Sequence, residues 1–137
     1  MPLDDDSYNF SFSGIKSAVI NVIHNEKKRG NEIRVNDMCN SFQERVVSVI
    51  VKKTMKAVSE YGVNNLVLAG GVAANSYLRE RLSCECDKCG INFFYPKIKF
   101  CTDNAAMIGA AAYYAYNKGI KADLCLNAVA VDNLYNE

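Results

Sequence analysis

The sequence predicts an α/β layer fold that is rich in helices and contains one short parallel pair of strands. The apolar run at residues 66–69 is typical of a buried parallel strand, and a second short apolar run at residues 91–95 indicates a strand beside it. Segments with helical periodicity surround both runs. A helical connection between the two strands makes them parallel. Sheets usually hold about four to six strands. We therefore expect residues 1–137 to form a single partial domain with an incomplete sheet.

The first expected elements are a short strand and a helix. Residues 9–13 alternate polar and aromatic side chains, as a half-buried strand does. Ser13 is of a residue type that caps helices, and helical periodicity follows it. This helix should end near Gly30, because the cations at 27–29 favour a C-terminal dipole and glycine favours a stop.

The second expected helix is the longest, with Asn36 or Asp37 as its cap and an end near Gly62. Its apolar positions recur every three or four residues and predict one buried stripe. The stripe comprises Phe42, Val46, Val47, Ile50, Val51, Met55 and Val58. The basic pair at 52 and 53 is expected on a solvated face, with local RNA contact as the alternative.

Two further helices and a connection complete the expected fold. A helix follows the glycines at 70 and 71, and residues 83–90 are expected to be a polar, cysteine-rich connection. Its buried face is expected to hold Ala74, Leu78 and Leu82, and its solvated face Arg79, Glu80 and Arg81. A last helix is expected from about residue 104 to 116, with mostly small side chains that allow close packing.

Gly70 and Gly71 are the first candidates for a binding site. Glycine tolerates positive φ and lacks a Cβ, so two in succession let main-chain N–H groups turn outward beside a helix N-terminus. That arrangement suits a phosphate or the polar edge of a nucleotide. Asn75 follows one turn later and offers both a donor and an acceptor. The alternative is a tight turn between strand and helix with no ligand.

Thr102, Asp103 and Asn104 precede the alanine-rich last helix. Thr102 or Asp103 can cap that helix by accepting from its first free N–H groups. Alternatively, Asp103 is a metal ligand, because hard carboxylate oxygens bind divalent cations. A carboxylate after a strand end also lies where open α/β sheets place ligand-binding groups.

Cysteine and histidine define what other chemistry the chain can carry. Cys84, Cys86, Cys89 and Cys101 are a candidate four-thiolate zinc set with irregular spacing, and reduced thiols are the alternative. His24 is the only histidine, and we expect it to be a partly exposed helical residue. One histidine cannot supply a His-rich metal centre, and any Ser–His–Asp or Cys–His arrangement would have to use it, so the chain lacks the parts of a self-contained hydrolase.

Composition narrows the class of protein further. Half of the residues are apolar and the net charge is +1, which argues against disorder and against a surface dedicated to coating nucleic acid. The acidic residues 1–6 lack the apolar core of a signal peptide, and the apolar run 105–116 is too short to span a bilayer. We therefore expect a cytoplasmic protein without a membrane partner.

Three segments together resemble a known family. Residues 10–16 read FSFSGIK, residues 69–75 read AGGVAAN, and residues 101–108 read CTDNAAMI. Their order and spacing closely resemble the C-terminal motifs of the TsaD family, also called Gcp or YgjD and formerly named O-sialoglycoprotein endopeptidases. The resemblance covers about residues 3–127.

The resemblance implies an actin/hexokinase/Hsp70-like (ASKHA, ribonuclease H-like) fold, in which two lobes enclose a nucleotide and a metal. It implies transfer of threonylcarbamoyl from threonylcarbamoyl-AMP to the N-6 amine of the tRNA adenosine beside the anticodon. By this analogy Asn75 contacts the nucleotide-like substrate and Gly70 and Gly71 line its cleft. Asp103 would ligate the metal, iron or zinc, which orients and polarises the acyl donor. TsaB and TsaE type proteins and tRNA are the implied partners.

One departure from the family limits what the chain does alone. The family's His-x-x-x-His metal ligands are absent, because His24 has no second histidine. We therefore expect a C-terminal lobe fragment with an incomplete metal site, no catalytic residue of its own and no transferase activity by itself. Its exposed apolar surface and unpaired strand edge should favour self-association.

Two alternative functions remain at the level of sequence. A metallopeptidase needs a metal-activated water and a general base, and the chain carries no H-E-x-x-H pair. A non-enzymatic nucleotide-binding or interaction module needs neither of these groups.

Overall fold

The computed structural model describes residues 7–127 and divides the chain into two compact units. The first unit is Met1–Cys101 and the second is Thr102–Glu137, and each is described by itself. Residues 1–6, whose acidic composition is the basis for predicting no signal peptide, lie outside the described residues. The same holds for residues 128–137.

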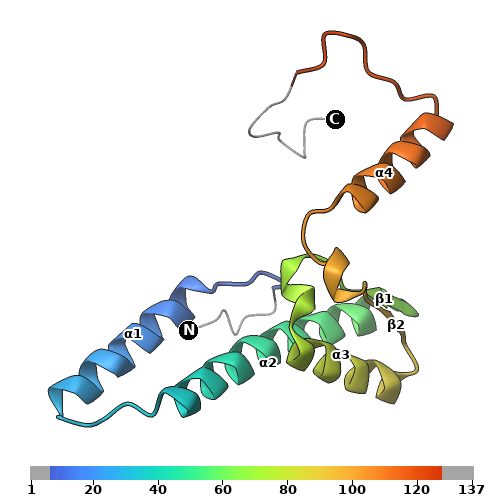
Figure 1. Cartoon of the computed structure of the whole chain (residues 1–137). Helices are drawn as coiled ribbons and strands as arrows, with labels where there is room; N and C mark the ends of the chain where they lie inside the picture. The colour runs from blue at the N-terminus through green and yellow to red at the C-terminus, as the bar shows by residue number, and fades with distance from the viewer. Residues whose placement is uncertain (1–6, 128–137) are drawn as a thin grey trace. The chain divides into compact units, whose positions relative to one another are not determined.

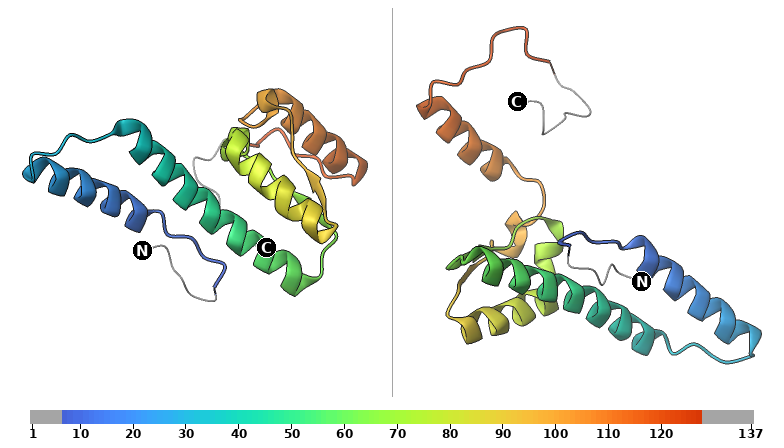
Figure 2. Two further views of the ribbon diagram at one scale, coloured as in Figure 1. Left: turned by 90° about the horizontal axis from the view of Figure 1, so that it is seen from below. Right: turned by 180° about the vertical axis from the view of Figure 1, so that it is seen from behind.

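The first unit combines helices with the expected parallel strand pair (Figure 1). Its elements are α1 (Ser13–Lys28), α2 (Val35–Tyr61), β1 (Asn65–Val67), the 3₁₀ helix Gly71–Ala74, α3 (Ser76–Cys89), β2 (Asn92–Phe94) and the 3₁₀ helix Ile98–Phe100. β1 and β2 pair in parallel, with Leu66 opposite Phe93. α1 and α2 lie side by side, and α3 packs on α2 (Figure 2). The helix-rich α/β class and the parallel pair are therefore confirmed.

The core of the first unit lies between α2 and α3. Val47 and Val51 of α2 meet Leu78 and Leu82 of α3, and all four side chains are buried. Burial of each such side chain contributes about 1.5–3 kcal/mol. Partly buried side chains surround this cluster: Ile50, Met55, Leu66, Leu68, Tyr77 and Phe93. The predicted stripe of α2 is confirmed at these positions, whereas Phe42 at its N-terminal end is 44 % exposed.

The strands are less buried than predicted. Only the central residues, Leu66 and Phe93, are half-buried, and the four flanking strand residues are exposed. Both central side chains point to the face that packs against the core. A two-stranded sheet with one covered face leaves its alternate side chains in solvent. The prediction of a buried strand at residues 66–69 is therefore wrong for Val67 and Ala69, which are exposed, whereas Leu66 and Leu68 are half-buried.

The segment before α1 contains no strand, contrary to the prediction for residues 9–13. Instead it is tied to α2, because the ammonium of Lys53 donates to the main-chain carbonyls of Ser7 and Asn9, each at 2.7 Å. These bonds explain how Lys53 is only 8 % exposed. The prediction that this lysine lies on a solvated face is wrong.

The first two helices lack the side-chain caps that the sequence predicted. Phe12 is the N-cap of α1, so Ser13 is already its first helical residue. Arg34 is the N-cap of α2, and neither cap makes a side-chain bond. Asp37 lies in the first turn of α2 instead, where a carboxylate favours the helix dipole, and pairs with Arg34 at 2.8 Å.

The expected connection at residues 83–90 is helical, which corrects the prediction. α3 continues through it to Cys89 and ends at Gly90, which has φ +68. The reason is visible in the packing, because Leu78, Leu82 and Cys86 recur every four residues and are all buried. The polar residues between them fill the solvated face of the same helix.

The second unit contains α4 (Ala105–Asn117), close to the predicted bounds. Its cap is Asn104, whose Oδ1 accepts from the N–H of Met107 at 3.0 Å, so the prediction of Thr102 or Asp103 as the cap is wrong. None of the residues of α4 is buried. Within residues 7–127, no helix is both long enough and apolar enough to cross a bilayer.

Candidate functional site

The glycine turn follows β1 and borders open space. Gly70 has φ +91, a conformation that other residues rarely adopt, so the backbone itself requires glycine there. Gly71 has no positive φ. A Cβ added at either position would meet no atom within 4 Å. Packing in this chain therefore does not explain the glycine at 71, whereas close approach of a ligand would.

The turn leads into the 3₁₀ helix Gly71–Ala74 rather than directly into α3. The helix predicted after the glycines therefore begins as a 3₁₀ helix at Gly71, and the α-helix follows only at Ser76. Asn75 caps α3, and its Oδ1 accepts from the N–H of Leu78 at 2.9 Å. The free N–H groups of α3 are thus partly satisfied from within the chain.

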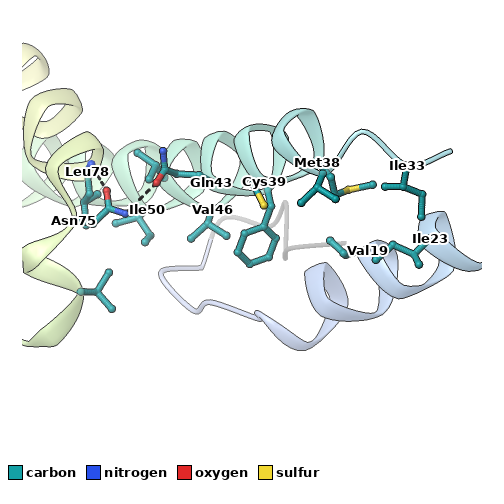
Figure 3. A pocket seen from close by; sticks show the side chains of 14 residues that line it. Val19, Ile23, Ile33, Met38, Cys39, Gln43, Val46, Ile50, Asn75 and Leu78 are labelled. Carbon is teal, nitrogen blue, oxygen red and sulfur yellow. Dashed lines mark hydrogen bonds between the residues drawn. The ribbon is translucent and has the colours of Figure 1, made fainter.

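Asn75 also contacts α2, because its Nδ2 donates to Oε1 of Gln43 at 3.2 Å (Figure 3). An asparagine amide has two N–H donors and two lone pairs on its oxygen. Nδ2 donates one hydrogen bond and Oδ1 accepts one, so one N–H and one lone pair of the amide remain for a ligand. Sequence reasoning missed the cap and the Gln43 partner, although an asparagine directly before a helical apolar pattern was a usable signal for the cap.

Arg79 crosses from α3 to two loops, which corrects its predicted place on a solvated face. Its Nε donates to the carbonyl of Ala73, and its Nη2 lies 3.0 Å from the carbonyl of Pro96. The same Nη2 lies 3.1 Å from Sγ of Cys101. The guanidinium also lies over the ring of Tyr95, 4.6 Å from its centroid. No motif in the sequence indicated these contacts.

A second polar cluster links α2 to α3. Arg81 donates to Oε1 of Glu44 at 2.9 Å and to the hydroxyl of Tyr77 at 2.8 Å, and the Tyr77 hydroxyl donates to Glu44. The Tyr77 hydrogen bond, followed by that of Arg81, holds the pKa of Glu44 below its usual value. Arg81 is half-buried, so it also differs from its predicted solvated position.

Asp103 belongs to the second unit and its side chain is exposed. Asn104 takes over the capping of α4 and also donates from Nδ2 to the carbonyl of Thr102 at 2.8 Å. Helix capping therefore does not explain the acidic residue at 103, and its carboxylate is accessible. Its role as a metal ligand stays a prediction.

The cysteines do not form the candidate zinc set. Cys86 is buried in the core, and this burial raises the pKa of its thiol and so disfavours the thiolate that zinc requires. Cys84 and Cys89 are exposed, and Cys101 is buried beside Arg79. Across residues 7–127, no three His, Cys, Asp or Glu side chains lie together as a metal site. His24 is exposed on α1.

An apolar pocket of about 560 Å³ lies between α1 and α2. Figure 3 shows Asn75 and Gln43 at one end and Ile23 and Ile33 at the other. The lining between these ends is almost entirely aliphatic and aromatic, including Val46 and Phe42. Sequence periodicity assigned Phe42 to a buried stripe and gave no sign of this pocket.

A parallel strand pair, a glycine turn open on one side and a capped helix define an α/β protein whose strand–turn–helix unit can admit a ligand. Comparison with known proteins identifies the family. The sequence model of the TsaD family, described as tRNA N6-adenosine threonylcarbamoyltransferase, matches residues 1–110. The chain belongs to this family.

Curated relatives named tRNA N6-adenosine threonylcarbamoyltransferase are similar to almost the whole chain. The Staphylococcus saprophyticus protein is 53% identical over 125 residues, which is 91% of this chain and 36% of the relative. The Bacillus cereus (strain ATCC 14579) protein is 54% identical over 127 residues, which is 92% of this chain and 37% of the relative. The chain thus spans little more than a third of the length of these relatives.

Proposed function

We propose that this chain forms the C-terminal part of a tRNA N6-adenosine threonylcarbamoyltransferase with an ASKHA fold. The complete enzyme would move threonylcarbamoyl from threonylcarbamoyl-AMP to the N-6 amine of the adenosine beside the anticodon. The observation that carries this proposal is the family match over residues 1–110, together with 53% identity to a relative of that name.

The glycine turn is the proposed contact with the nucleotide part of the substrate. Gly70 supplies the positive φ that turns the backbone, and Gly71 leaves the adjoining space free of side-chain atoms. Asn75 has one N–H donor and one lone pair left after its bonds to Gln43 and Leu78. These groups suit the polar edge of threonylcarbamoyl-AMP or of another adenine nucleotide.

The described residues do not make a complete metal site. Asp103 is an accessible carboxylate, but no group of three suitable ligands exists among residues 7–127. We propose that Asp103 supplies one ligand to a divalent iron or zinc ion and that the other ligands come from the remainder of the enzyme. We assign no reaction step to the metal within this chain.

The proposed division of labour also defines the partners. The chain would bind and orient nucleotide, while tRNA and proteins of the TsaB and TsaE type would act with the complete enzyme in the cytoplasm. The isolated 137 residues would be inactive, because residues 7–127 hold no complete metal site and the chain spans little more than a third of its relatives. Self-association is the expected behaviour of their exposed apolar side chains.

A chimeric enzyme tests the proposal. The segment of the Staphylococcus saprophyticus transferase that matches this chain is replaced by this chain. The chimera is then expressed in cells depleted of their own enzyme, and threonylcarbamoyladenosine is measured in digested tRNA. We expect restored modification by the chimera and none by its Asp103→Ala variant.

A folded chimera that binds nucleotide but restores no modified nucleoside would contradict the transferase proposal and favour the interaction module. Restoration by both the chimera and its Asp103→Ala variant would retain the transferase but remove the role proposed for Asp103. The 137-residue chain expressed alone serves as the negative control.

A further inference from the structure

We propose that Arg79 is a positioning residue that fixes the glycine turn for nucleotide binding by joining it to the loop after β2. This inference rests on the proposed nucleotide-binding role of Gly70 and Gly71. It assigns Arg79 no contact with the substrate.

The topology explains why such a joint matters. β1 and β2 are parallel, so the glycine turn after β1 and residues 95–101 after β2 leave the same edge of the sheet. Open α/β sheets bind ligands beyond this carboxyl edge. Arg79 of α3, the helix that connects the two strands, reaches both segments. It contacts Ala73 in the first segment and Pro96 and Cys101 in the second.

Other restraints hold the end of the turn, where Ala73 is fully buried and Asn75 is bonded to Gln43 and Leu78. Within the turn, Ala73 N donates to the carbonyl of Gly70 and Asn75 N to that of Val72, each at 3.0 Å. Bonds of the 3₁₀ type have poorer geometry than those of an α-helix, and Gly71 adds no side chain to pack. Arg79 adds the link between this turn and the loop after β2, because its Nε donates to the Ala73 carbonyl while its Nη2 donates to the Pro96 carbonyl.

Only arginine has the shape for all of these contacts. Its guanidinium is planar and presents donors in a fixed fork, so Nε and Nη2 reach carbonyls from different loops at once. Its flat face also lies over the Tyr95 ring, 4.6 Å from the centroid. A lysine keeps the charge but offers a single compact ammonium, which cannot reproduce this fork.

The test compares Arg79→Lys with wild type and with Glu80→Ala, an exposed neighbour on α3, in the chimeric enzyme. Hydrogen–deuterium exchange reports on residues 70–75 and 95–101, with residues 47–58 of α2 as the internal reference. The affinity for adenosine monophosphate is measured by calorimetry. Arg79→Lys should speed exchange in both loops but not in α2. It should also lower the affinity for adenosine monophosphate about tenfold, which corresponds to about 1.4 kcal/mol. Glu80→Ala should match wild type.

Unchanged exchange in both loops would overturn the inference, and so would faster exchange with unchanged nucleotide affinity. Arg79→Ala serves as a second variant and should show the same pattern at greater amplitude. If the wild-type chimera itself fails to bind adenosine monophosphate, the proposed function fails at this site. Exchange then still decides separately whether Arg79 joins the two loops.

Discussion

Asn75 donates to Gln43 at 3.2 Å, so the residue that caps α3 is also anchored to α2. The same amide accepts from Leu78 N at 2.9 Å. Asn75 is therefore a structural joint at the end of the glycine turn as well as a candidate ligand contact. Variants of this residue have to separate the two roles.

Asn75→Ala should lower the free energy of unfolding by about 1 kcal/mol through loss of the helix cap. Asn75→Asp keeps an oxygen that accepts from Leu78 but has no N–H for Gln43 or a nucleotide. We expect Asn75→Asp to retain most of the stability in urea unfolding and still to weaken nucleotide binding in the chimera. Equal nucleotide affinity in wild type and Asn75→Asp would show that Asn75 has a structural role only.

Asp103→Asn should reduce the iron or zinc that copurifies with the chimera, because an amide is a poorer ligand than a carboxylate for a divalent cation. Elemental analysis of purified protein measures the loss. The matched control is Asp87→Asn, since Asp87 is an exposed carboxylate on α3. Metal content that falls equally in both variants, or in neither, would contradict the role of Asp103.

Lys53→Met should lower the free energy of unfolding by about 1–3 kcal/mol, because the carbonyls of Ser7 and Asn9 lose a charged donor. Limited proteolysis should then cut before α1 more rapidly. Lys16→Met is the control, since Lys16 is exposed on α1. If Lys53→Met and Lys16→Met unfold at the same urea concentration, the anchoring by Lys53 contributes nothing.

Stability should depend on pH through Glu44. The Tyr77 hydrogen bond and then Arg81 lower its pKa in the folded protein from 4.5, so the carboxylate stabilises the fold above this pH. The stabilisation should disappear as the pH falls below 4.5 through the lowered pKa. Unfolding of wild type and Glu44→Gln should therefore differ most near neutral pH and converge in acid. In a Tyr77→Phe background the convergence should be weaker, and a constant difference would refute the linkage.

The isolated chain should self-associate, so light scattering at high concentration should give a mass above 15.2 kDa. We expect the apolar pocket between α1 and α2 to take part, because Val35 in its lining is 66 % exposed. Val35→Lys should shift the chain towards monomer. Ile98→Lys is the matched control, since Ile98 is equally exposed at 66 % and lies outside this pocket. A monomeric wild-type chain would refute the prediction.

Much of the fold could be predicted from the sequence because the relevant forces are local. The four-residue recurrence of apolar positions indicates which face of α2 and α3 packs. The glycine at 70 indicates a backbone turn with positive φ, which other residues avoid. The parallel pairing of β1 and β2 follows from the helix between them. Helix caps were less predictable, because any of several neighbouring polar residues can accept the same N–H groups.

Only the tertiary structure decided which polar side chains link segments that are distant in the sequence. Gln43 and Asn75 are 32 residues apart, and Arg79 reaches Cys101 over 22 residues. Lys53 is buried where its ammonium meets two carbonyls that precede α1. The sequence pattern around a charged or amide side chain is the same whether that side chain faces solvent or bonds to a distant segment. Its role is set by what the fold brings within hydrogen-bonding distance, and that distance is not encoded in spacing along the chain.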